Sequence, residues 1–292
     1  MNAHALAAGS LARRHRIQKC MWGVFGLSSL VNLAALVLIC AFVLIQGLPA
    51  STWSFLTEMP RDSMTAGGIL PCIIGTIALS LGTMVVAFPL GVASAVYLNE
   101  YAKPGRMLRL IRLGINNLAG VPSVVFGLFG LAFFVTFFGL GVSLISGILT
   151  LSILVLPVII GTAEEALRSV PQTYREASLG LGATKWQTIR LVVLPAALPG
   201  MLTGAILGLS RVAGETAAIM FTAAVFYTPS LPTSLGDSIM ALPYHIYVLA
   251  TAGTEIDKTR PLQYGTALVL IVLVLGMNLT AILYRAHLQK RR

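Results

Sequence analysis

The sequence predicts an all-α membrane protein with six transmembrane helices, and three observations support this prediction. Of the 292 residues, 57% are apolar and only 10% are charged, whereas a soluble domain carries roughly 25% charged residues. The apolar residues gather in six segments long enough to cross a bilayer as helices. Lys and Arg gather in alternate connections between these segments, as the positive-inside rule requires.

The predicted spans follow one another through a single membrane domain. They cover residues 22–46, 69–97, 115–139, 141–163, 197–224 and 265–284. A basic cytoplasmic arm (1–21) precedes the first span, whose apolar run exceeds the roughly 7–15 residues of a signal-peptide core, so we expect a retained anchor helix. Residues 69–285 form the main transmembrane domain, and residues 286–292 form a tail.

The segment 238–251 is apolar but too short to cross a bilayer, and it contains Pro243. We therefore expect a helix at the outer face that is either interfacial or re-entrant. The stretch GVPSVVFGLFG (120–130) carries several helix breakers inside a predicted span. Such residues either allow close helix packing or kink a helix that lines a pathway.

The basic residues fix the predicted orientation. Four lie in each of four segments: the N-terminal arm, the connection after the second span, the connection 164–195 and the C-terminal tail. Only Arg61, Lys258 and Arg260 fall on the opposite side, and Arg211 lies inside a span. The positive-inside rule therefore places both termini and residues 164–195 in the cytoplasm. This distribution explains the net charge of +10 through membrane topology, so we expect no nucleic-acid partner.

The scattered Cys and His residues predict neither a metal site nor a disulfide framework. The three Cys are an odd number, and the four His are far apart in the sequence. Neither set has the spacing of metal ligands.

The connection 164–195 is predicted to contain a helix over residues 172–179. Its residues are good or neutral helix formers, and Tyr174, Ala177 and Leu181 lie on one stripe of such a helix. The alternative is an ordinary solvated linker, which loop-length statistics make common.

A glycine turn and a second helix are predicted to follow. Gly182 suits a left-handed helix stop, and Thr184 with Gln187 has the spacing of a capping box. Pro195 marks the entry to the fifth span. Together these features predict a rigid helix–turn–helix knob on the cytoplasmic side.

This connection resembles the EAA signature of the permease subunits of bacterial ABC importers. The signature reads Glu-Ala-Ala, then a Gly, then Ile-x-Leu-Pro; Ser178 and Val192 are conservative departures from it. The resemblance implies the type I importer permease (MetI-like) fold, in which this motif forms coupling helices that dock into a groove of the ATPase subunit. The residues expected to couple to the ATPase are Tyr174, Glu176, Ala177, Ser178, Gly182, Leu194 and Pro195.

The stretch RVAGETAAIMFTA (211–223) is similar to the fifth span of the phosphate-specific permeases, in which Gly-Glu-Thr-Ala recurs. The Arg four residues before the Glu and the FTA that follows favour the A-subunit type. PSVVFGLFG (122–130) and the arrangement of residues 70–285 are also similar. The resemblance implies one permease subunit of an ATP-driven phosphate importer in the bacterial inner membrane. It further implies a second permease, two ATP-binding subunits and an extracytoplasmic phosphate-binding protein as partners.

The sequence itself gives an independent indication that this chain is not the ATPase. None of its lysines follows a Gly, which a Gly-x4-Gly-Lys phosphate loop requires. We therefore expect no cofactor and no catalytic residue in this chain, with ATP and Mg bound by partner subunits.

Arg211 and Glu215 need a separate explanation because they lie near the middle of a predicted span. A lone charge there costs about 2.5–3.5 kcal/mol on insertion scales, and the i, i+4 spacing would let the two pair on one helix face. Two interpretations remain open: a static structural pair, or a pair that lines the phosphate path and from which Arg211 opens in one state. Ser210, Thr216 and Ser123 could add hydroxyl donors to such a path.

Two further functions remain possible at this stage. One is a permease for another oxyanion, such as phosphonate, sulfate or molybdate. The other is an ion-coupled secondary carrier, which would leave the 164–195 connection unexplained. An intramembrane hydrolase is disfavoured because its usual motifs are absent from the sequence. The outer segment 225–263, with Asp237, Glu255 and Asp257, is expected to contact the binding protein.

Overall fold

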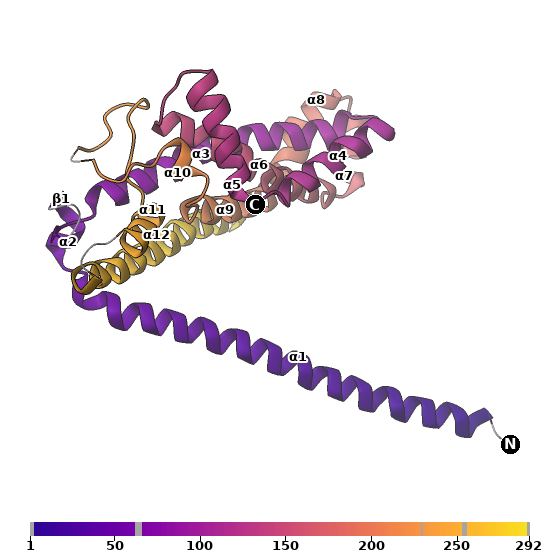
Figure 1. Ribbon diagram of the computed structural model, residues 1–292. Coiled ribbons are helices and arrows are strands. Elements are labelled where there is room, and N and C mark those ends of the chain that lie inside the picture. The colour runs from indigo at the N-terminus through magenta and orange to yellow at the C-terminus, as the bar shows by residue number, and fades with distance from the viewer. Residues whose placement is uncertain (1–2, 62–65, 229, 253–255, 291–292) are drawn as a thin grey trace.

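The computed structural model describes residues 3–61, 66–228, 230–252 and 256–290 and is built almost entirely of helices (Figure 1). The helices are α1 (Ala3–Gly47), α2 (Trp53–Thr57), α3 (Leu70–Val96), α4 (Arg106–Ala119), α5 (Ser123–Gly130), α6 (Leu144–Arg168), α7 (Gln172–Gly180), α8 (Lys185–Thr188), α9 (Leu194–Ala213), α10 (Ile219–Thr222), α11 (Leu242–Thr251) and α12 (Ile256–Lys290). Short π-helical segments extend α3 (Tyr97–Tyr101) and α5 (Leu131–Phe137) and join α8 to α9 (Ile189–Val193). A short 3-10 helix (Leu48–Ala50) and an antiparallel pair, β1 (Pro60–Arg61) and β2 (Ala66–Gly67), complete the described elements.

The predicted number of spans agrees with the structure. Five segments are long and apolar enough to cross a membrane, and a bent pair of helices makes a sixth. The five segments are Ile17–Ala50, Leu70–Tyr101, Leu144–Arg168, Lys185–Ala213 and Thr259–His287. All five overlap predicted spans.

The third span differs from the prediction of one helix over residues 115–139. Its two parts, Arg106–Ala119 and Ser123–Phe137, meet at an angle of 100°. The physical reason is Pro122, which disfavours a helical conformation at Val121. The chain therefore turns sharply between α4 and α5.

The fifth span also departs from its predicted bounds of 197–224. It begins earlier, because α8 runs into α9 without a break, and it ends at Ala213. Gly214 caps α9, and the helix resumes only at α10. The segment 214–218 therefore interrupts the helix within the predicted span.

The bundle is centred on α6, whose contacts with α3 and with α9 are the two most extensive between helices. In Figure 1, β1 and α2 lie at one end of the molecule, whereas α4, α7 and α8 gather at the other. The basic connections thus share one end, as the topology predicted from charge requires. Helix α1 leaves the bundle and contacts it near its C-terminal end, where the rings of Phe42 and Tyr264 meet edge to face at 5.4 Å.

One side of helix α11 is buried in protein. Leu242, His245, Val248 and Leu249 are all buried, and the helix packs mainly against α12 and also against α3. The Leu242 N–H donates to Thr76 Oγ1 at 2.9 Å. The other side of α11 is open, with Tyr247 46% exposed, so the interfacial and the re-entrant placement both stay predictions.

Candidate functional site

The segment between α6 and α9 folds as the predicted helix–turn–helix, here named the α7–α8 hairpin (residues 172–188). Pro171 precedes the first turn of α7. Gly182 has φ +83°, the left-handed conformation predicted for it. Thr184 and Gln187 form the predicted capping box: the Gln187 N–H donates to Thr184 Oγ1 at 3.3 Å, and the Thr184 N–H donates to Gln187 Oε1 at 2.8 Å. These local features fix the turn and the direction of α8.

The hairpin exposes large apolar side chains. Leu181 is 89% exposed and Trp186 54% exposed, and Tyr174 is exposed on α7. The apolar stripe predicted on α7 therefore faces outward from this chain. Exposed apolar surface of this kind marks a site of interaction with another protein or with a membrane.

The signature residues divide into an outward group and an attachment group. Glu176 and Ala177 are exposed on α7, whereas Leu194 and Pro195 are partly buried where α9 begins. Ser178 is partly buried, and its Oγ lies 2.9 Å from Thr188 Oγ1, which links α7 to α8. All of these residues therefore lie on one continuous stretch of the chain, from α7 to the start of α9.

The main link from the hairpin to the bundle is Arg175. Its Nη2 donates to Glu100 Oε1 at 2.8 Å, and its Nε donates to Glu100 Oε2 at 3.4 Å. The same guanidinium donates to the Leu167 carbonyl at 2.9 Å and to the Val170 carbonyl at 2.8 Å. Asn99 Nδ2 donates to Glu100 at 2.8 Å. One side chain therefore joins α7, the end of α6 and the end of the α3 span.

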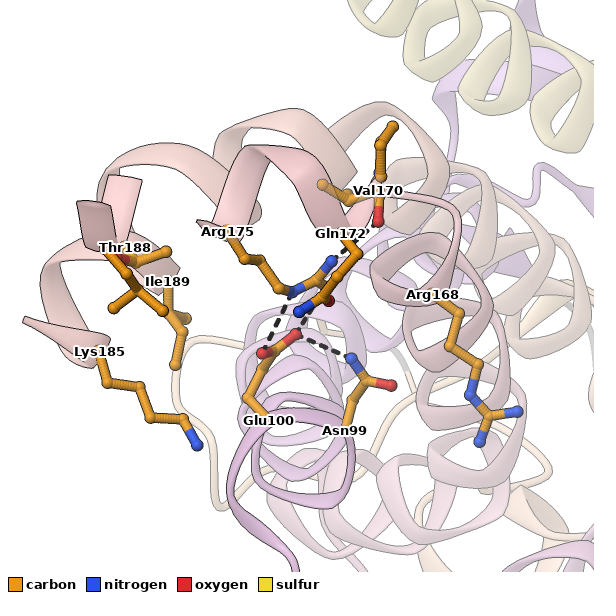
Figure 2. Close-up of a pocket in the computed structure, with 11 residues that line it drawn as sticks. Asn99, Glu100, Arg168, Val170, Gln172, Arg175, Lys185, Thr188 and Ile189 are labelled. Carbon is orange, nitrogen blue, oxygen red and sulfur yellow. Dashed lines mark hydrogen bonds and ion pairs between the residues drawn. The ribbon is translucent and has the colours of Figure 1, made fainter. Parts of the chain in front are cut away.

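This pair is largely buried. The side chain of Arg175 is 13% exposed and that of Glu100 is 9% exposed. Figure 2 shows the two side chains pointing toward each other, with Arg168 and Lys185 on opposite sides of the pair. Removing one member of such a pair leaves an uncompensated buried charge, which is strongly destabilising.

The pair lies in the wall of an open pocket of about 720 Å³. The lining residues are Asn99, Glu100, Arg168, Val170, Pro171, Gln172, Arg175, Leu179, Lys185, Thr188 and Ile189. Lys185 Nζ lies 4.9 Å from the centre of the Tyr101 ring, a cation–π contact that adds a link between α8 and the α3 span.

A second ionic cluster lies at the same end of the bundle. Arg112 of α4 is 3.1 Å from Glu164 of α6, and Arg168 is 3.5 Å from the same carboxylate. Arg112 also donates to the Leu98 carbonyl at 3.2 Å. This cluster connects α4 to both α6 and the α3 span.

The predicted Arg211–Glu215 pair does not form, which corrects that prediction. Within the described part of the chain, the ion pairs join Arg61 to Glu58, Arg112 and Arg168 to Glu164, and Arg175 to Glu100. Because α9 ends at Ala213, the two residues do not share a helix face. Glu215 is partly buried and accepts the Ala218 N–H at 3.3 Å. Arg211 is exposed in the last turn of α9.

The hydroxyl residues predicted beside this pair do not form one cluster. Ser210 Oγ lies 2.9 Å from Asn278 Oδ1 and 2.9 Å from the Ile206 carbonyl, so it links α9 to α12. Thr216 is partly buried in the interruption, and Ser123 is partly buried at the start of α5.

The absence of a side chain at Gly127 allows α5 to lie close to the 214–218 interruption and to α10. A Cβ on Gly127 would lie 2.8 Å from the Phe221 ring and 3.0 Å from the Ala217 carbonyl oxygen. Of the two interpretations of GVPSVVFGLFG, close packing therefore holds at Gly127. The kinked helix holds at Pro122, as the bent third span shows.

Asp237, predicted to contact a binding protein, stabilises the turn over residues 233–237 through its side chain. Its carboxylate accepts the N–H and hydroxyl of Thr233 at 2.7 and 3.0 Å, and those of Ser234 at 2.9 and 3.0 Å. The Thr233 N–H first, and then the Ser234 N–H, lower the pKa of Asp237 to about 2. Glu255 and the side chain of Asp257 lie outside the described residues.

Sequence reasoning missed Arg175 and Glu100 as functional residues. Helical periodicity alone places Arg175 on the polar side of its helix, away from the stripe of Tyr174, Ala177 and Leu181. Its acid partner is 75 residues away in the sequence. No local pattern joins residues at that separation, so only the tertiary structure reveals the link.

The bundle and its exposed hairpin define a membrane subunit with several spans, and comparisons with known proteins identify its family. A family model described as the binding-protein-dependent transport system inner membrane component matches residues 87–292. The probable ABC transporter permease protein YqgI of Bacillus subtilis is 35% identical over 90% of this chain and 93% of its own length. The phosphate transport system permease protein PstA 1 of Mycobacterium tuberculosis is 35% identical over 97% of this chain and 93% of its own length.

Solved structures agree on the fold. An inward-facing structure of the MetNI methionine ABC transporter has a TM-score of 0.58 and 21% identity over 76% of this chain and 94% of that chain. A bacterial alginate ABC transporter has a TM-score of 0.55 and 15% identity over 89% of this chain and 94% of that chain. The chain belongs to the family of binding-protein-dependent transport system inner membrane components, which are ABC transporter permease subunits. The predicted type I importer permease fold is thereby confirmed.

Proposed function

We propose that this chain is the permease subunit of an ATP-driven importer of inorganic phosphate and forms half of the translocation pathway. The similarity to phosphate transport permeases extends over nearly the whole chain and favours phosphate as the cargo. A second permease subunit forms the other half of the pathway. Two ATP-binding subunits and an extracytoplasmic phosphate-binding protein complete the transporter.

The α7–α8 hairpin carries the proposal. Its exposed apolar residues, Tyr174, Leu181 and Trp186, fit the groove of a separate ATP-binding subunit. ATP and Mg bind to that subunit, because this sequence contains no phosphate loop. In this arrangement the permease itself catalyses no reaction.

The attachment of the hairpin supports a mechanism for coupling. The hairpin lies between α6 and α9, and Arg175 joins it to the end of the α3 span through Glu100. When the ATP-binding subunits close, they move the hairpin and thereby reorient these three spans. Packed helices transmit such displacements because the protein interior is compact and nearly incompressible.

Arg211 is the proposed contact for phosphate within the membrane. It carries a planar fork of N–H donors that suits a phosphate oxyanion, and it lies beside the 214–218 interruption in the helix. Such irregular backbone is tolerated at membrane depth only where it is buried in protein or lines a water-filled cavity. Because Glu215 does not pair with it, Arg211 is available to an anion.

The orientation in the bacterial inner membrane follows from charge. The end of the bundle that holds α4, α7 and α8 carries the basic connections and is cytoplasmic. Both termini then lie on the cytoplasmic side. On the same basis the outer segment 225–263 belongs to the periplasmic side, where the binding protein docks.

Competition transport assays test the proposed cargo. Vesicles bearing the complete transporter are supplied with the binding protein, ATP and radiolabelled phosphate, with excess unlabelled phosphate, phosphonate, sulfate or molybdate. Only unlabelled phosphate should abolish the labelled uptake. Suppression by another oxyanion, with little effect of phosphate, would assign the transporter to that anion instead. Uptake that needs no ATP would favour a secondary carrier.

A further inference from the structure

Helices α9 and α12 are joined by two polar contacts that lie two helical turns apart. Ser210 Oγ lies 2.9 Å from Asn278 Oδ1, and Arg285 Nη1 donates to Thr203 Oγ1 at 2.7 Å. The partners are seven residues apart on each helix and follow in opposite directions, so both contacts lie on one line between antiparallel helices, here named the α9–α12 seam. Arg285, near the C-terminal end of α12, thus reaches the surface of α9.

Arg285 reaches the same face of α9 that carries Arg211. Residues at intervals of three or four define this face, namely Gly200, Thr203, Leu207 and Arg211. All of them are exposed except Thr203, which is partly buried and bonded to Arg285. Thr203 lies eight residues before Arg211, about 12 Å along the helix axis at about 1.5 Å per residue. The two arginines therefore lie in series, with Arg285 nearer the α7–α8 hairpin.

The charge of Arg285 is not neutralised within the described part of the chain. Arg285 takes part in none of the ion pairs there, and its Nε–H is enclosed without a hydrogen-bond partner. The sequence contains no Asp or Glu between Glu176 and Glu215 or after Asp257, so neither α9 nor the rest of α12 supplies an acid. A buried donor without an acceptor is costly. The full set of donors of this guanidinium is therefore satisfied only by another arrangement that brings it an acceptor.

We propose that Arg285 is a second contact for phosphate, nearer the cytoplasm than Arg211, on one route along the exposed face of α9. The inference rests on the proposed function, which makes phosphate the cargo and Arg211 the first contact. When the α9–α12 seam loosens, Arg285 leaves Thr203 and presents its fork of donors, Nε–H included, to the anion. Charged side chains inside a membrane face a bundle interior or a water-filled cavity. Two sites in series bind the anion weakly enough at each for it to move on.

Uptake of radiolabelled phosphate by vesicles carrying the complete transporter tests this role, with ATP hydrolysis measured in parallel. Arg285→Gln should lower the phosphate transported per ATP roughly tenfold, because one charge-assisted contact is lost. Arg285→Lys should be intermediate, since it keeps the charge and loses the planar fork. Co-purification of the second permease and the ATP-binding subunit checks assembly. If Arg285→Gln does not assemble, Arg285→Lys decides: wild-type uptake would show that a pairing charge suffices and would overturn the proposal.

Thr203→Val is the matched control that separates a phosphate contact from a structural link. It removes the acceptor of the Arg285 hydrogen bond and leaves the charge in place. The ratio of phosphate to ATP should therefore stay close to that of the wild type. Equal losses in Thr203→Val and Arg285→Gln would overturn the proposal, since they would show that Arg285 only joins the two helices. A wild-type ratio in an assembled Arg285→Gln transporter would overturn it as well.

The lipid and the cargo are distinguished by two further comparisons. The variants are measured in phosphatidylcholine alone and with an equal part of phosphatidylglycerol, and Arg285→Gln should lose the same fraction of uptake in both. A loss confined to vesicles with phosphatidylglycerol would assign Arg285 to a lipid phosphate instead. If the wild type carries another oxyanion, the proposed cargo fails, and the same variants measured with that anion decide separately whether Arg285 contacts it.

Discussion

Arg175 and Glu100 form a largely buried ion pair at 2.8 Å between the α7–α8 hairpin and the end of the α3 span. The same guanidinium also donates to the Leu167 carbonyl of α6 and to the Val170 carbonyl just after that helix. A movement of α7 therefore transfers directly to two membrane spans. The account of coupling depends on this link more than on any other contact.

Replacing Arg175 tests the link. Arg175→Met leaves Glu100 buried without its partner and should lower the free energy of unfolding by about 3–5 kcal/mol. Adding Glu100→Met should recover most of that loss, because it removes the unpaired charge. Thermal unfolding of the purified transporter in detergent measures both effects.

The double variant separates coupling from stability. It should remain folded but transport less phosphate per ATP hydrolysed, because the hairpin has lost its ionic link to the α3 span and keeps only the contact of Lys185 with Tyr101. Arg168→Met is the control: that side chain is 52% exposed, so its loss should change stability by less than about 1 kcal/mol. A folded double variant with the wild-type ratio of phosphate to ATP would refute the link.

Gly182→Ala tests the turn of the hairpin. An alanine in the left-handed conformation costs about 1–2 kcal/mol, so the variant should reorient Leu181 and weaken binding of the ATP-binding subunit up to roughly tenfold. Titrated co-purification of that subunit measures the effect. Gly180→Ala is a matched control, since Gly180 has open space around its Cα and lacks a positive φ. Equal binding by both variants would contradict the role of the turn.

Arg211→Gln tests the proposed phosphate contact. Loss of one charge-assisted contact, worth about 1.5–3 kcal/mol, should reduce kcat/KM for phosphate uptake at least tenfold. Arg211→Lys should be intermediate, because it keeps the charge and loses the planar fork. Glu215→Gln should transport nearly normally, since its amide oxygen can still accept the Ala218 N–H. Wild-type uptake by a fully assembled Arg211→Gln transporter would exclude the contact.

Asp237 makes the outer turn sensitive to acid. Its pKa is lowered from 3.8 to about 2, so its carboxylate stabilises the turn above pH 3.8 and loses this effect as the pH falls towards 2. Hydrogen exchange at the Thr233 and Ser234 amides should show the loss of protection in that interval. Asp237→Asn should show weak protection and little dependence on pH across the same interval. Protection in the wild type that is constant down to pH 2 would disprove this role.

Local rules predicted the hairpin well. The Gly182 stop and the capping box of Thr184 with Gln187 depend on residues within one helical turn, so their spacing in the sequence carries the information. The position of the hairpin between two spans followed from hydropathy and charge. Its link through Glu100 did not, because that contact depends on how distant helices pack.

The two incorrect predictions in the spans have a common cause. Average hydropathy identified apolar stretches but not interruptions within them. Pro122 breaks the third span, and Gly214 ends α9 one residue before Glu215. The pairing of Arg211 with Glu215 assumed a continuous helix, so it failed where the helix ended. The i, i+4 rule holds only within a helix, and α9 ends between these two residues.

The most direct test of the account is ATP-dependent phosphate uptake by vesicles carrying wild type, Glu176→Lys or Glu165→Lys, with retention of the ATP-binding subunit checked by co-purification. Both glutamates are exposed, but only Glu176 lies on the hairpin. The account predicts ATP-dependent uptake that Glu176→Lys abolishes together with docking, while Glu165→Lys preserves both. Uptake that ignores ATP and survives Glu176→Lys would contradict the account.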